Sequence, residues 1–198
     1  MKIGIIGGTF DPIHFGHLRI AEEARIQMEL DKVVFVPNGV PSHKDCSAVT
    51  PAEVRFEMTQ LATESNPDFE VTRIEIDRPG KSYTFDTLSA FQLANPDSEL
   101  FFIIGMDSVT EIPSWYRWQD ITRMATFVAA ERPGFEFEDI RKTIPMELSS
   151  RVMPLKTPQL EISATDIRNR VCANSSIRYL LPHSVIELIY KQNLYVKE

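Results

Sequence analysis

The strongest constraint on the fold lies at the start of the chain, where a short apolar run ends in two glycines. Residues 2–6 are largely β-branched, and Gly7 and Gly8 follow directly. An amphipathic segment extends from Leu18 to Met28. A buried strand, a glycine turn and a helix start are the parts of a phosphate cradle, because glycine lets the backbone approach an anion and the helix N-terminus offers N–H groups. This order predicts a phosphate site in the first turn of an α/β fold.

Further apolar runs recur along the chain, and segments with helical periodicity lie between them. The predicted strands are 3–6, 32–36, 69–76, 100–104 and 125–129. The predicted helices are 21–30, 51–65, 84–95 and 118–124, with Thr50 capping the second and Ser82 or Thr84 capping the third. This alternation favours a mainly parallel sheet, which binds ligands at the carboxyl ends of its strands. Segments 7–9, 37–39 and 105–107 should then lie along one edge.

The C-terminal part has a different pattern, which predicts a small helical part from about residue 162 within a single domain, 1–198. Ser163 suits an N-cap, with Asp166 three positions later as a weaker capping-box partner. Pro182 precedes an amphipathic last helix. Segments 37–48 and 133–145 are rich in proline, glycine and polar residues, which predicts mobile loops near the ligand edge.

The composition argues against several classes of protein. The chain has 198 residues and a formal net charge of −7, which argues against a general nucleic-acid binder but not against an enzyme that acts on nucleotides. No apolar stretch approaches the roughly 20 residues of a membrane helix, and the N-terminus does not resemble a signal peptide. Cys46 and Cys172 indicate no disulfide framework and fit a reducing cytoplasm.

His14 and His17 follow the glycine turn and are separated by three positions. They could cap a helix or lie on the surface, or they could bind zinc together with His43 and Cys46. The preceding glycines and Thr9 favour phosphate binding instead. Imidazole N–H groups at about 2.7–3.1 Å from phosphate oxygens can stabilise the charge that develops in nucleotidyl transfer.

A second anion site is predicted at Ser163, Thr165 and Arg168, where hydroxyls, helix N–H groups and a guanidinium lie within one turn. A capped surface helix is the alternative. The first cradle suits an α-phosphate, and this second site suits the β- and γ-phosphates. Lys44 follows the second strand at the ligand edge, so we expect it to contact phosphate, whereas Arg55 on a predicted helix suits a surface role as well as a functional one.

Aromatic and polar residues complete the predicted ligand edge. Thr84 lies at a helix start whose N–H groups could receive a carboxylate. Trp115 and Tyr116 could stack on a flat ring, although aromatic residues after a loop are more often part of a core. Asp107 could hold a ribose hydroxyl or a Mg²⁺-bound water, or cap a turn.

In their order along the chain, these motifs resemble the bacterial nicotinate-nucleotide adenylyltransferases of the nucleotidyltransferase superfamily. The motifs are 7–18 with its His-x-Gly-His, 37–44, 55, 82–88, 105–107, 115–118, 132–133, 162–168 and the Tyr-Leu-Leu-Pro before the last helix. The resemblance covers essentially the whole chain and implies a Rossmann-like, three-layer nucleotidyltransferase fold. Ala164 stands where the family usually has a second serine, which concerns one hydroxyl contact rather than the whole site.

The resemblance implies a role for each motif. His14 and His17 are implied to be catalytic, stabilising the transferring α-phosphoryl group. The residues implied to bind ATP are Gly7, Gly8, Thr9, Phe10, Gly105, Asp107, Arg132, Ser163, Thr165 and Arg168. The residues implied to bind the mononucleotide are Lys44, Thr84, Trp115 and Tyr116. No side chain is implied as a metal ligand, because Mg²⁺ is carried by ATP.

The implied reaction joins ATP and nicotinate mononucleotide, giving deamido-NAD and pyrophosphate in NAD biosynthesis, with Mg²⁺ as cofactor. The alternatives are a nicotinamide-mononucleotide or phosphopantetheine adenylyltransferase, a sister enzyme that uses CTP, a non-catalytic nucleotide sensor and a zinc-stabilised interaction domain. We expect no nucleic-acid or membrane partner, and the small acidic chain fits a monomer or a homodimer.

Overall fold

The centre of the protein, seen in a computed structural model, is a parallel β-sheet. The structure describes residues 1–40, 49–131, 134, 136–158 and 160–196. Within them the sheet has 6 strands in the order β3-β2-β1-β4-β5-β6, and every neighbouring pair is parallel. The strands are β1 Lys2–Gly8, β2 Lys32–Pro37, β3 Phe69–Val71, β4 Glu99–Gly105, β5 Thr126–Ala130 and β6 Val152–Leu155.

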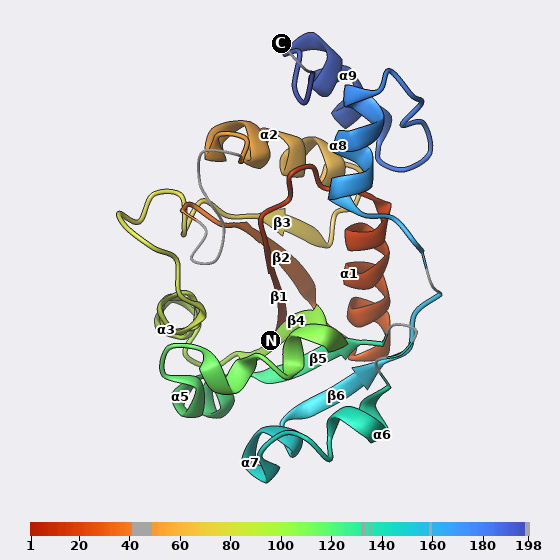
Figure 1. The fold of residues 1–198 in the computed structure, drawn as a ribbon. Coiled ribbons are helices and arrows are strands. Elements are labelled where there is room, and N and C mark those ends of the chain that lie inside the picture. The colour runs from red at the N-terminus through yellow and green to blue at the C-terminus, as the bar shows by residue number, and fades with distance from the viewer. Residues whose placement is uncertain (41–48, 132–133, 135, 159, 197–198) are drawn as a thin grey trace.

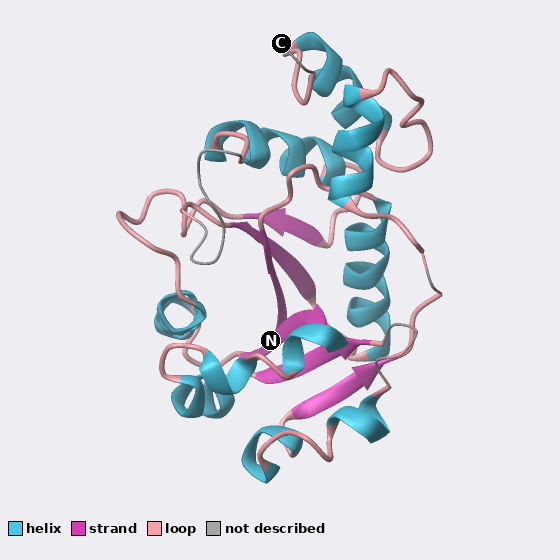
Figure 2. Ribbon diagram, viewed as in Figure 1, coloured by secondary structure: helices cyan, strands magenta, loops and turns pink. Residues whose placement is uncertain are grey.

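Helices connect the strands and cover both faces of the sheet (Figure 1, Figure 2). They are α1 Phe15–Gln27, α2 Ala52–Thr63, α3 Thr84–Ala94, α4 Met106–Val109, α5 Trp118–Met124, α6 Phe137–Ile140, α7 Met146–Ser149, α8 Ala164–Cys172 and α9 His183–Lys191. One face packs against α1, α2, α8 and α9, and the other packs against α3, α4, α5 and α7. This three-layer α/β arrangement is the predicted fold class.

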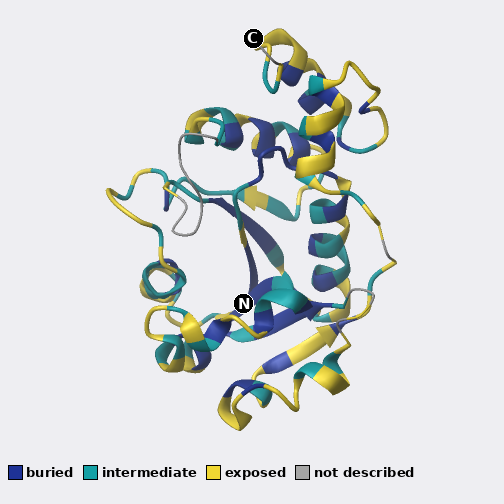
Figure 3. Cartoon of the chain, viewed as in Figure 1, coloured by how far each residue is buried: buried dark blue, intermediate teal, exposed yellow. Residues whose placement is uncertain are grey.

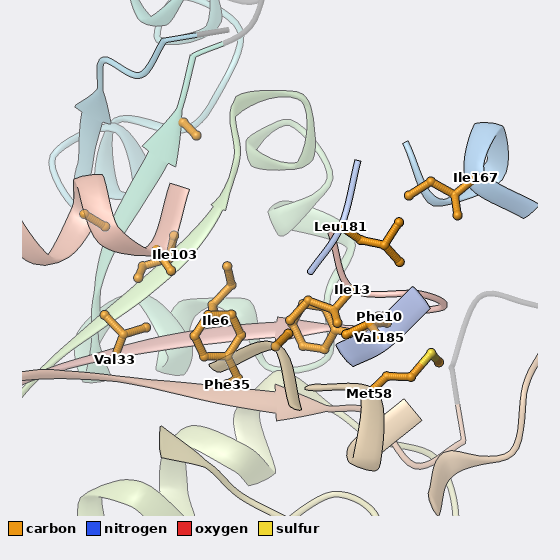
Figure 4. Close-up of a cluster of buried hydrophobic side chains, with 14 of the residues drawn as sticks. Ile6, Phe10, Ile13, Val33, Phe35, Met58, Ile103, Ile167, Leu181 and Val185 are labelled. Atoms are coloured by element: carbon orange, nitrogen blue, oxygen red, sulfur yellow. The ribbon is translucent and has the colours of Figure 1, made fainter. Parts of the chain in front are cut away.

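Alternation of side chains along each strand divides the core into two clusters. In β1, Ile3 and Ile5 join the cluster under α3 and α5, whereas Ile6 joins the cluster under α1 and α2. Figure 4 shows the second of these clusters, in which Phe35 from β2 lies among side chains from several elements. The inner strands β1, β2, β4 and β5 are consequently mostly buried, whereas the edge strands β3 and β6 and the outer faces of the helices are partly exposed (Figure 3).

The strand order reverses at β1, which pairs with β2 on one side and with β4 on the other. Parallel α/β sheets bind ligands beside the carboxyl ends of the strands at such a switch point. The glycine-containing segments 7–9, 37–39 and 105–107 lie at the ends of β1, β2 and β4. They are therefore at the same edge of the sheet, as the sequence predicted.

The structure corrects the sequence predictions at several boundaries. The run 69–76 forms a strand only as far as Val71, and β6 was not predicted. Pro51 rather than Thr50 occupies the N-cap of α2, because the Thr50 backbone is engaged by Asp11 and Arg55. Tyr83 rather than Ser82 or Thr84 precedes α3, without a side-chain cap. The segment 133–145, expected as a loop, contains α6.

Other predictions are confirmed. The predicted helix 118–124 matches α5. Ser163 is the N-cap of α8, and its hydroxyl accepts a hydrogen bond from the Asp166 N–H at 3.1 Å. The Asp166 carboxylate pairs instead with Arg170, at 2.6 Å, so it does not complete the capping box. The last helix is α9, which buries Val185, Ile186, Leu188 and Ile189.

Candidate active site

A cavity of about 730 Å³ lies beside the carboxyl ends of β1, β2 and β4, and we call it the edge cavity. Its lining includes Gly7, Gly8, Thr9, Asn38, Thr84, Gly105, Trp115 and Tyr116. The structure therefore brings the predicted glycine cradle together with the predicted mononucleotide-binding residues. Gly105, which the resemblance assigned to ATP, lines the same cavity, whereas Asp107 follows in the first turn of α4 and is not among the described residues that line it.

Aromatic side chains form one wall of the edge cavity. The rings of Tyr83 and Tyr116 lie 5.1 Å apart, and the ring of Trp115 meets Phe102 edge to face at 6.3 Å. Thr84 is the first residue of α3, so this wall adjoins a helix N-terminus. A flat ring carrying a negative group suits such a wall, because aromatic faces stack on the ring and helix N–H groups bind an anion.

Glu75 contributes a carboxyl group to the edge cavity that sequence reasoning missed. The residue is 8% exposed, and its Oε1 accepts a hydrogen bond from the Thr87 hydroxyl at 2.6 Å. Burial raises the pKa of Glu75, while the Thr87 hydrogen bond and the positive charge of Arg78 act in the opposite direction. Glu75 was not predicted as a site residue because it lies inside the predicted strand 69–76. A single acidic residue in a strand pattern does not indicate a binding site.

The second pocket, which we call the histidine pocket, has a volume of about 360 Å³. Its lining includes His14, Gly16, His17, Glu131 and Ser163. Both predicted catalytic histidines thus meet the N-cap of the predicted second anion site. A helix N-terminus, a hydroxyl and two imidazoles form a site that suits phosphate oxygens.

The two histidines have a defined mutual geometry at the start of α1. His14 is the N-cap and is 6% exposed, and its backbone N–H donates to Nδ1 of His17 at 3.3 Å. The rings stack with centroids 3.7 Å apart. Because Nδ1 of His17 accepts, the neutral ring carries its proton on Nε2, which is then the donor nitrogen. A Cβ at Gly16 would lie 3.0 Å from the His14 ring, so glycine at this position leaves room for the stacked pair.

Arg168 anchors α8 to the loop that connects β1 with α1. The Arg168 guanidinium donates to the Asp11 carbonyl oxygen at 2.7 Å and to the Thr165 hydroxyl at 3.2 Å. Phe10 belongs to the same loop, and its side chain is 3% exposed and packs in the core, which leaves its backbone for the predicted cradle. The resemblance assigned Phe10 to the cradle and Thr165 and Arg168 to the triphosphate, and these roles stay predictions.

Arg55 lies beneath the same loop and is 1% exposed, so the surface role weighed for it is wrong. Its guanidinium donates to the carbonyl oxygens of Thr9, Asn38, Gly39 and Thr50 and to Oδ1 of Asn38, at 2.7–3.0 Å. Burial lowers the pKa of Arg55, and the nearby Asp11 carboxylate acts in the opposite direction. One buried cation therefore connects the segments that follow β1 and β2.

Some predicted residues lie outside the described part of the chain. These are Lys44 and Arg132, and also His43 and Cys46 of the zinc alternative. Among the described residues, no group of 3 or more His, Cys, Asp and Glu side chains could hold a metal ion. None of the described helices combines the length and apolarity needed to cross a membrane.

The chain is similar to known proteins of one family. The cytidylyltransferase-like family model matches residues 5–170. A protein of Moorella thermoacetica, named a probable nicotinate-nucleotide adenylyltransferase, is 50% identical over 98% of this chain and 91% of its own length. A protein of the same name from Mycolicibacterium vanbaalenii is 45% identical over 100% of this chain and 93% of its own.

A solved structure has the same fold. It is the Plasmodium falciparum nicotinic acid mononucleotide adenylyltransferase complexed with NaAD, which superposes with a TM-score of 0.82. The sequence identity is 22%, and the match covers 98% of this chain and 97% of that one. At this identity the likeness concerns the arrangement of strands and helices.

Proposed function

The chain belongs to the nicotinate-nucleotide adenylyltransferase family, and from this premise we propose that it transfers the adenylyl group of ATP to nicotinate mononucleotide, giving deamido-NAD and pyrophosphate. One observation carries the proposal: two pockets of different chemistry are joined by the loop between β1 and α1. The edge cavity suits a pyridine ring with a carboxylate, and the histidine pocket suits phosphates. The NaAD bound in the Plasmodium falciparum enzyme agrees with a ligand of this kind.

In this proposal, a phosphate oxygen of the mononucleotide attacks the α-phosphorus of ATP. A new P–O bond forms, the bond between the α-phosphorus and the bridging oxygen breaks, and pyrophosphate leaves with the electron pair. A phosphate monoester is already nucleophilic at neutral pH, so no general base is needed. His14 and His17 stabilise the charge that develops on the transferring group, and Ser163 holds the departing phosphates.

We propose that Mg²⁺ arrives on the triphosphate and is held by its oxygen atoms. Mg²⁺ keeps several waters and prefers phosphate oxygens and a few carboxylates. When bound, it neutralises part of the charge on the leaving pyrophosphate. The described lining of the histidine pocket holds imidazole and hydroxyl donors for the phosphates together with the carboxylates of Glu131 and Glu161, and Mg²⁺ carried by the substrate would offset part of the negative charge gathered there. We place the reaction in the cytoplasm and regard a monomer or a homodimer as the assembly to test.

The proposal is tested by pyrophosphate release with ATP and Mg²⁺, using nicotinate mononucleotide, nicotinamide mononucleotide and phosphopantetheine as parallel acceptors. We expect a strong preference for nicotinate mononucleotide. The aromatic wall of the edge cavity suits a flat pyridine ring, which phosphopantetheine lacks. Activity with another acceptor alone would leave the phosphate chemistry in place and refute the assigned acceptor. No activity with any of them would favour a nucleotide sensor.

A further inference from the structure

The loop that leads from β1 to the histidines has an unfavourable backbone conformation. Phe10 has φ of 48°, which a residue with a bulky side chain rarely adopts. Such a conformation persists only where the surroundings hold it in place. Four residues later, His14 begins the histidine pair, and the Phe10 ring meets the His17 ring edge to face at 5.1 Å. The conformation of this loop therefore affects the orientation of the histidines.

Asp11 is the point at which distant parts of the chain hold this loop. It is 5% exposed. Its Oδ1 accepts a hydrogen bond from the Tyr195 hydroxyl at 2.6 Å, and its Oδ2 accepts one from the Thr50 N–H at 3.2 Å. Its carbonyl oxygen accepts the bond from Arg168 at 2.7 Å. Three segments that are far apart in sequence thus converge on one residue of the loop.

Tyr195 reaches Asp11 from the C-terminal end of the described chain, beyond α9. Its ring packs against the core near Met58, whose sulfur lies 4.0 Å from the hydroxyl. Burial raises the pKa of Tyr195, and the neighbouring Asp11 charge raises it further, so the hydroxyl keeps its proton and remains a donor at neutral pH. The bond from Tyr195 to the Asp11 carboxylate is short and charge-assisted, which makes it a strong restraint on the loop.

We infer that Tyr195 is a positioning residue for catalysis: acting through Asp11, it holds the loop so that His14 and His17 face the phosphates. This inference rests on the proposed function. Tyr195 is not among the described residues that line either pocket, and its hydroxyl reaches the loop through the hydrogen bond to Asp11. Its effect should therefore appear in kcat, because misplaced catalytic groups slow the chemical step even when substrates still bind.

The test is Tyr195→Phe, which removes the hydroxyl and keeps the ring that packs in the core. We expect kcat to fall roughly tenfold, as for a small misplacement of catalytic groups. We expect the KM values for both substrates to change much less, and the circular dichroism spectrum to stay unchanged. Tyr190→Phe is the matched control, because Tyr190 lies on α9 with its side chain 53% exposed, and it should retain the wild-type kcat. An unchanged kcat in Tyr195→Phe, or a fall that matches a loss of folded protein, would overturn the inference.

A second measurement does not depend on activity. Hydrogen–deuterium exchange of peptides that cover residues 9–17 should be faster in Tyr195→Phe than in the wild type, with the strands of the sheet unaffected. Unchanged exchange in that segment would refute the restraint even if the enzyme proved active. If the wild type proved inactive with nicotinate mononucleotide, faster exchange would still support the restraint, and only the proposed function would fail.

Discussion

The edge cavity and the histidine pocket share a loop, but they are built from different chemistry. The edge cavity is about twice the volume, at about 730 Å³ against about 360 Å³, and aromatic rings with a buried carboxyl line it. The lining of the histidine pocket includes two imidazoles, the hydroxyl that caps α8, and the carboxylates of Glu131 and Glu161, but no aromatic ring other than the imidazoles among the described residues. The first suits a flat ring and the second suits phosphate oxygens. In the proposed function the loop after β1 serves both substrates, because Thr9 at its start lines the edge cavity and His14 at its end lines the histidine pocket.

The largest expected effect tests the histidine pocket alone. His14→Ala and His17→Ala should each lower kcat by about 10²–10³, the typical result of removing one donor that stabilises developing charge. The acceptor KM should change little, because neither ring lines the edge cavity. Pyrophosphate release measures both constants, and circular dichroism reports folding.

The control for the histidine variants is His183→Ala, whose side chain is 82% exposed at the start of α9. It should behave as the wild type. A His14 or His17 variant with near-normal kcat would remove that residue from the mechanism.

The next largest effect is on stability and concerns Arg55, which donates hydrogen bonds to the loop shared by the two pockets. Arg55→Ala would remove the buried guanidinium that donates to the partly buried carbonyl oxygens of Thr9, Asn38 and Gly39, at a cost of about 3 kcal/mol in the free energy of unfolding. Urea denaturation measures this loss.

Arg73 offers a matched comparison for Arg55. Its guanidinium also donates several hydrogen bonds, to Glu53 and Asp77, but at the exposed surface. Exposed ion pairs contribute little. Arg73→Ala should therefore leave the urea midpoint almost unchanged, and equal losses in the two variants would contradict the role given to burial.

A smaller effect sharpens the description of the edge cavity. Because burial raises the pKa of Glu75, the folded state binds a proton there more readily than the unfolded state. The carboxyl group therefore contributes stability that is fully present below its unfolded pKa and is lost as the pH rises through its folded pKa. Glu75→Gln stays neutral and can still accept from Thr87, so its stability relative to the wild type should increase as the pH rises from below the unfolded pKa of a glutamate through the raised folded pKa of Glu75.

The control for this pH dependence is Glu99→Gln, at an exposed position at the start of β4. It should show no comparable trend in urea denaturation. A Glu75→Gln curve parallel to the wild type at every pH would show that burial does not penalise the ionised carboxyl.

The sequence predicted the elements that carry local periodicity and missed those that depend on tertiary contacts. β6 contains Pro154, which an edge strand tolerates but which breaks the pattern of a central strand. In the run 69–76 isoleucines still alternate with polar residues beyond Val71, as in a strand, yet the strand ends there and Glu75 lines the edge cavity. No local pattern separates a buried arginine from an exposed one, so Arg55 could not be assigned.

In the candidate site, too, residues in contiguous motifs could be predicted from the sequence, and contacts between distant residues could not. Gly7, Gly8, His14, His17 and Ser163 stand in contiguous motifs, and the structure brings each of them to one of the two pockets. The bond between Asp11 and Tyr195 joins residues 184 positions apart, which only the folded chain brings together. Arg168 was expected to bind phosphate, but its bond to the Asp11 carbonyl gives it a second role that the sequence does not reveal.

The most direct test of the two-pocket account is to measure both KM values in Trp115→Ala and in Arg168→Ala. Trp115 lines the edge cavity, so its loss should raise the KM for nicotinate mononucleotide about tenfold and leave the KM for ATP near the wild-type value. The resemblance assigns Arg168 to the second anion site, and its guanidinium also holds the Asp11 carbonyl oxygen, so its loss should raise the KM for ATP, lower kcat and leave the acceptor KM near the wild-type value. If either variant raised both KM values equally, the division of the two substrates between the two pockets would be wrong.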